Sequence, residues 1–123
     1  MDKIRPPELD DRLSNGVEPY VLDIRPRESY QRGNIDGSQN VPVYDDLRRG
    51  DDTVLRQSLA AIPDGKTVVT VCKAGIVAKK ATAVLEEEGY DAVTLAGGIR
   101  GWNGYRNGSI GYRLSSTLAR LLR

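Results

Sequence analysis

The chain of 123 residues is 39% apolar and 28% charged with a net charge of +1, which is ordinary for one globular domain and predicts no binding to nucleic acid or membranes. Its single cysteine and lack of histidine exclude an intrachain disulfide framework, an ordinary structural zinc site and any mechanism that needs an imidazole base. No apolar run reaches the roughly 18 residues of a membrane span, and the first residues do not resemble a secretory signal. Since a lone thiol also suits a reducing compartment, we expect a cytoplasmic protein.

Three short apolar runs predict the strands of a sheet. They cover residues 20–24, 67–71 and 92–96, and the second is almost continuously β-branched. Nearly continuous apolar runs of this length are typical of strands that are buried on both faces of a parallel sheet.

Helices are predicted between these runs. They cover residues 7–13, residues 27–32, a segment whose apolar face carries Leu55, Leu59 and Ile62, and a segment from about Val77 to the glycine at position 89. The alternation predicts an α/β fold with a central parallel sheet of four or five strands, flanked by helices on both faces.

The C-terminal stretch, residues 112–123, has four leucines spaced for one helix face: Leu114, Leu118, Leu121 and Leu122. Residues 92–123 also hold five arginines and no acidic residue. One interpretation is a final helix that packs on the sheet and exposes a solvated basic face. The other is a docking helix for an acidic partner or a membrane surface.

The cysteine occupies a distinctive position, because Cys72 directly follows the strongest predicted strand and Gly75 leads on into the strongest predicted helix. Ligands of open α/β folds bind at the carboxyl ends of strands, and the free backbone amides of a helix start stabilise an anion. A thiolate nucleophile can therefore exist here without a histidine. The alternative is that Cys72 is a small buried apolar residue.

The charges of this predicted helix run against its dipole, with Lys79 and Lys80 in the first turn and three glutamates in the last. They are interpreted either as a source of positive field around Cys72 or as screened surface charges without consequence.

Three stretches, in a fixed order and spacing, indicate a known family. They comprise residues 21–25, 28–30 and 33–42, then Cys72 to Gly75, then residues 89–93 and 95–99 followed by Trp102. On these residues the chain, from about residue 4 to residue 105, resembles the rhodanese domain, a sulfurtransferase family.

The resemblance implies a single rhodanese-like domain over residues 1–123 that needs no cofactor or metal. Cys72 would take the outer sulfur of thiosulfate or a persulfide, including a protein persulfide, and pass it to a thiol or another thiophilic acceptor. The backbone amides of the substrate-binding loop would hold the charged persulfide. That loop consists of Lys73, Ala74, Gly75, Ile76 and Val77.

Other matched positions have structural roles in this interpretation. Asp23 and Arg25 match an Asp-x-Arg motif that holds neighbouring loops through charge-assisted hydrogen bonds. Trp102 is expected to pack in the core.

The active-site loop departs from the family, which often has Cys-x-x-Gly-x-Arg-Ser, because Val77 and Ala78 fill its last two positions. Without the arginine, thiosulfate is expected to be a poor donor, and Ile76 with Val77 should form an apolar rim that favours an organic donor. The alternative function is a catalytically weak or inactive binding module of the same fold. A phosphatase of the related cell-cycle type is disfavoured, because it needs an arginine where the chain has Ala78.

Overall fold

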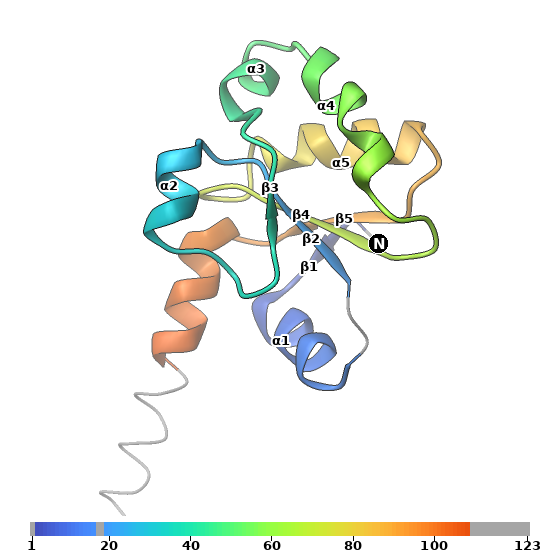
Figure 1. Ribbon diagram of the computed structural model, residues 1–123. Helices are drawn as coiled ribbons and strands as arrows, with labels where there is room; N and C mark the ends of the chain where they lie inside the picture. Colours follow the sequence, from blue (N-terminus) through green and yellow to red (C-terminus); the bar gives the residue numbers. More distant parts are fainter. Residues whose placement is uncertain (1, 17–18, 109–123) are drawn as a thin grey trace, which may run out of the picture.

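The computed structural model describes residues 2–16 and 19–108, which form an α/β fold around one sheet (Figure 1). Its strands are β1 (Lys3–Ile4), β2 (Tyr20–Asp23), β3 (Gln39–Asn40), β4 (Val68–Val71) and β5 (Ala92–Leu95). They lie in the order β1-β5-β4-β2-β3, and every neighbouring pair is parallel. The predicted class and parallel sheet are confirmed, and within the described residues the sheet has five strands.

The three predicted strands are the central ones. All residues of β4 and β5 are buried, as expected for strands covered on both sides. The outer strands β1 and β3 were not predicted, because each has only two residues and β3 is wholly polar. They lie at the two edges of the sheet, where one side of the backbone is free of strand partners within the described chain.

Helices cover both faces of the sheet, as predicted (Figure 1). One face carries α3 (Tyr44–Arg48), α4 (Thr53–Gln57), the 3-10 helix η1 (Leu59–Ala61) and α5 (Ala78–Glu87). The other carries α1 (Pro6–Ser14) and a helix over residues 98–108, while α2 (Arg27–Arg32) follows β2. Neighbouring residues of β2 divide between the two cores, because Leu22 packs with α3, α4 and α5 and Val21 packs with α1.

The helix expected to carry Leu55, Leu59 and Ile62 is interrupted. α4 ends at Gln57, and a 3-10 turn follows. The interruption has a local cause, since the Ser58 hydroxyl donates to the carbonyl of Val54 at 2.8 Å while its amide is shared between two carbonyls. The three apolar side chains nevertheless all reach the core, so the predicted face is correct and the predicted single helix is wrong.

The opposed charges of α5 serve its contacts with α3 and α4. Lys80 Nζ donates to the carbonyl of Leu47 at 3.2 Å, close to the C-terminus of α3, where a cation is favourable. At the other end of α5, Glu87 and Glu88 accept from Arg56 of α4 at 2.7 and 2.6 Å. These partners explain the placement of Lys80, Glu87 and Glu88 without reference to Cys72.

The predicted C-terminal helix over residues 112–123 lies outside the described residues. In the described part of the chain, no helix combines the length and apolar character that crossing a membrane requires. Trp102 is buried in the core on the α1 face, as predicted.

Three buried threonines join the sheet to α5. Thr82 of α5 hydrogen-bonds to Thr70 of β4 at 2.8 Å and to Thr94 of β5 at 2.7 Å. Thr70 also donates to the carbonyl of Ala78 at 3.1 Å, in the first turn of the helix. This chain of hydroxyls satisfies the polar groups that three buried threonines bring into an otherwise apolar core.

Replacement of Thr82 by valine is expected to lower the free energy of unfolding by about 1–3 kcal/mol, because the buried hydroxyl of Thr94 loses its partner. The double variant Thr82→Val/Thr94→Val removes the unsatisfied group and should recover part of that loss. Urea unfolding of both proteins measures the difference. A double variant that is no more stable than Thr82→Val would show that the hydroxyls do not act as a pair.

Candidate functional site

Cys72 lies at the carboxyl end of β4, on the face covered by α5, and its side chain is 2% exposed. Two backbone amides within the described residues donate to Sγ: those of Gly75 at 3.1 Å and Ala78 at 3.4 Å. The first belongs to the loop and the second to the first turn of α5. The sulfur therefore sits at the amide end of a helix, in an environment suited to negative charge.

The loop after Cys72 presents a mixed surface. Lys73 and Ala74 are exposed and Gly75 is buried. Ile76 is 71% exposed, whereas Val77 is 8% exposed and packs in the core beneath α5. The expected apolar rim is therefore formed by Ile76, and the side chain of Val77 belongs to the protein interior.

The expectation that the amides of residues 73–77 hold a charged persulfide stays a prediction. Within this loop the amide of Gly75 donates to the thiol, and the amide of Ala78, which lies outside the predicted range, donates to it as well. The signal for the Ala78 amide was present in the sequence, because the helix predicted from about Val77 has free amides in its first turn. A bond from any other predicted amide to a sulfur-bound substrate stays a prediction.

The start of the 98–108 helix is hydrogen-bonded to the Cys72 loop. The Ile99 amide donates to the carbonyl of Cys72 at 2.8 Å, and the Arg100 amide donates to that of Lys73 at 3.1 Å. Gly98 has φ +59°, and a Cβ there would lie 2.4 Å from the Cys72 carbonyl oxygen. Only glycine allows this approach of two backbones without displacement.

Replacement of Gly98 by alanine is expected to reduce the free energy of unfolding by about 2–3 kcal/mol and to displace the Cys72 loop, because the new methyl overlaps its backbone. Gly89→Ala is the matched control, since Gly89 also has positive φ but its Cβ would meet no atom within 4 Å. Thermal unfolding of both variants separates the overlap from the backbone conformation. Equal losses in the two variants would contradict this account.

Asp23 and Arg25 form a buried ion pair just after β2. Arg25 donates to Asp23 Oδ2 at 2.8 Å and, through the same Nη2, to the carbonyl of Gly33 at 2.7 Å. Asn40 completes the junction by donating to the carbonyls of Asp23 and Arg25. The pair thus links the end of β2 to the loop after α2, a geometry consistent with the structural role proposed for the motif.

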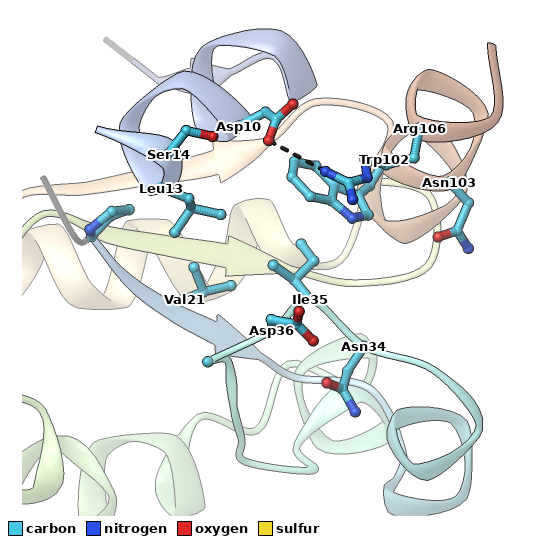
Figure 2. A pocket seen from close by; sticks show the side chains of 12 residues that line it. Asp10, Leu13, Ser14, Val21, Asn34, Ile35, Asp36, Trp102, Asn103 and Arg106 are labelled. Atoms are coloured by element: carbon cyan, nitrogen blue, oxygen red, sulfur yellow. Dashed lines mark hydrogen bonds and ion pairs between the residues drawn. The ribbon is translucent and has the colours of Figure 1, made fainter. Parts of the chain in front are cut away.

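A separate cavity of about 550 Å³ lies between α1, the 98–108 helix and the loop over residues 34–37 (Figure 2). Figure 2 shows Asp10 of α1 paired with Arg106, which lies over the ring of Trp102. The Tyr105 hydroxyl also donates to Asp10 at 2.8 Å, and this hydrogen bond raises the pKa of Tyr105 above its ordinary value. No residue of the 72–77 loop lines this cavity.

Comparison with known proteins identifies the family. The family model described as rhodanese-like domain matches residues 5–105. The chain belongs to the rhodanese-like domain family. This confirms the resemblance carried by Cys72 and the motifs on either side of it.

Curated relatives named as sulfurtransferases include proteins from Mycobacterium tuberculosis and Escherichia coli. The chain is 34% identical to the probable adenylyltransferase/sulfurtransferase MoeZ of Mycobacterium tuberculosis over 80% of its own length, but this match spans only 24% of MoeZ. It is 32% identical to the thiosulfate sulfurtransferase PspE of Escherichia coli, with 66% of this chain and 71% of PspE covered. The family and these relatives support sulfur transfer in general.

A solved rhodanese-like domain protein from Staphylococcus aureus has the same fold. It superposes with a TM-score of 0.70 at 24% identity, and covers 83% of this chain and 91% of the other. At 24% identity this comparison shows a shared fold and nothing more.

Proposed function

We propose that this rhodanese domain is a sulfurtransferase in which Cys72 carries the transferred sulfur as a persulfide. The observation that carries the proposal is the position of Sγ at the start of α5, with the amides of Gly75 and Ala78 directed at it. A persulfide formed there bears its negative charge close to these donors and to the exposed loop.

The transfer proceeds in two displacements. The Cys72 thiolate attacks the outer sulfur of a persulfide R–S–S⁻, so that a new Sγ–S bond forms while the S–S bond of the donor breaks and its electron pair leaves with R–S⁻. An acceptor thiolate then attacks the outer sulfur of the Cys72 persulfide, forms its own S–S bond and regenerates the Cys72 thiolate. Both steps balance without an added oxidant or reductant.

The donor is proposed to be an organic or protein persulfide rather than thiosulfate. Val77, where the family often has arginine, is packed in the core and offers no charge to a sulfonate. A hydrogen bond to a charged group is worth about 1.5–3 kcal/mol, so its absence weakens thiosulfate binding about ten- to a hundredfold. The exposed side chain of Ile76 instead offers apolar contact to an organic group.

Replacement of Ile76 by arginine is expected to lower the KM for thiosulfate by about tenfold, because it adds a cation to the loop at an exposed position. Val54→Arg is the matched control, since Val54 is 45% exposed but lies on α4. Steady-state transfer to cyanide supplies both KM values. An unchanged KM, or an equal decrease in the control, would show that the loop charge does not set donor choice.

The function itself is tested by comparing thiosulfate, glutathione persulfide and a protein persulfide as donors, with cyanide or a small thiol as acceptor. We expect turnover with the persulfides and a smaller kcat/KM with thiosulfate. If the chain were instead an inactive binding module, no donor would give turnover. The placement of Cys72 against two amides favours the enzyme.

The compartment and physiological partners follow from the same chemistry. A lone thiol that must stay reduced between turnovers suits the cytoplasm. A protein thiol is included among the proposed acceptors, since the exposed side chain of Ile76 offers apolar contact to a docked protein.

A further inference from the structure

A second cavity, of about 500 Å³, adjoins the Cys72 loop beside the 98–108 helix. Lys73 lines it from the loop, and Ile99, Arg100 and Asn103 line it from the helix. Arg32 of α2 and Asp45 of α3 lie at its wall as well. Its size falls in the range of about 300–1,000 Å³ that holds small organic ligands.

The charge of this cavity is predominantly positive. Of its cations, Arg25 is already neutralised by Asp23. The ion pairs recorded for the described residues involve none of the other three, which are Arg32, Lys73 and Arg100. These three face a single lining carboxylate, that of Asp45, so the cavity attracts anions.

Two backbone hydrogen bonds fix the position of this cavity relative to the Cys72 loop. The amide of Ile99 donates to the carbonyl of Cys72 at 2.8 Å, and that of Arg100 donates to the carbonyl of Lys73 at 3.1 Å. The backbone that carries Arg100 is therefore bonded directly to the backbone that follows Cys72. An anionic group bound by Arg100 is held beside the loop that presents the thiol.

We propose that this cavity binds the carboxylate of the organic persulfide that loads Cys72, an inference that rests on the proposed sulfurtransferase function. Guanidinium groups such as those of Arg32 and Arg100 match a carboxylate with two parallel N–H donors. A carboxylate several bonds away from the sulfane sulfur can enter the cavity while that sulfur approaches Sγ. In thiosulfate the charged sulfonate group is bonded directly to the transferred sulfur and therefore lacks this reach.

The experiment compares glutathione persulfide with the persulfide of glutathione diethyl ester, in which both carboxylates are masked. Arg32→Gln and Arg100→Gln should each lower kcat/KM for loading of Cys72 by glutathione persulfide about three- to tenfold, and the double variant further. The ester should react equally with all forms. Arg27→Gln is the matched control, because Arg27 is exposed on the same helix as Arg32 but does not line the cavity.

Three results would overturn the proposal. The first is loading by glutathione persulfide that is unchanged in the double variant. The second is an equal loss with the ester, which would place the effect outside carboxylate recognition. The third is an equal loss in Arg27→Gln, which would assign the effect to overall charge.

A binding measurement separates this inference from the proposed function. S-methylglutathione carries both carboxylates but has no transferable sulfur, and calorimetry should show its Kd rising about tenfold in the double variant. If the wild-type protein loads sulfur normally but neither loading nor this Kd responds to Arg32 and Arg100, the cavity proposal fails and the sulfurtransferase remains. If Cys72 accepts no sulfur from either persulfide, the sulfurtransferase proposal fails, and with it the inference.

Discussion

Replacement of Cys72 by serine is expected to lower sulfur transfer by more than about a thousandfold, to the uncatalysed level, because the chain has no other thiol to carry the sulfur. A serine hydroxyl is a far weaker nucleophile toward sulfur and forms no persulfide. The amides of Gly75 and Ala78, which now donate to Sγ, can donate to the serine oxygen instead. The substitution therefore keeps an acceptor for both amides.

The stability of Cys72→Ser serves as its control, with an expected loss of about 1 kcal/mol in urea unfolding. Near-ultraviolet circular dichroism, which reports on the packing of Trp102, should match that of the wild-type protein. Turnover retained in a folded Cys72→Ser protein would contradict the persulfide mechanism. A folded variant without turnover would support it.

Replacement of Asp23 by alanine is expected to lower the free energy of unfolding by about 3–5 kcal/mol. Asp23 and Arg25 are both buried, and the carboxylate accepts from Nε and Nη2 of the arginine. Without it, a buried guanidinium keeps only the carbonyl of Gly33 as a recorded partner. The desolvated charge, rather than the lost bond, accounts for most of the expected effect.

Asp46→Ala provides the matched control for Asp23→Ala. Asp46 pairs with Arg49 at the same distance of 2.8 Å, but the arginine side chain is 62% exposed. Removing an exposed partner costs about 0–1 kcal/mol, because water replaces it. In urea unfolding, the loss of unfolding free energy should therefore be several times larger for Asp23→Ala than for Asp46→Ala. Equal losses would show that burial of the Asp23–Arg25 pair does not determine its contribution to stability.

The central elements of the fold could be predicted because their patterns are strong. β4 is a run of β-branched residues, and α5 repeats apolar residues at helical spacing before Gly89. β1 and β3 are two residues long and are defined by pairing with distant strands, which a local pattern does not contain. The break of the α4 segment depended on one hydroxyl, that of Ser58, and its bond to the chain.

The features of the site that follow from the order of elements along the chain were predicted. Those that depend on the orientation of individual side chains were not. A thiol between a strand and a helix start follows from chain order, so the contact of Sγ with amides was expected. The opposite orientations of Ile76 and Val77 could not be predicted, because a loop has no periodicity from which to infer them. The basic cavity was also missed, since Arg32 and Arg100 are far apart in the sequence.

The central claim, that Cys72 carries sulfur, is tested most directly by the mass of the intact protein after treatment with glutathione persulfide and removal of the donor. Because Cys72 is the chain's one cysteine, we expect a gain of one sulfur atom. That gain should disappear on addition of cyanide and be absent from Cys72→Ser. A wild-type mass unchanged by glutathione persulfide, thiosulfate and a protein persulfide alike, or a sulfur gain that persists in Cys72→Ser, would contradict it.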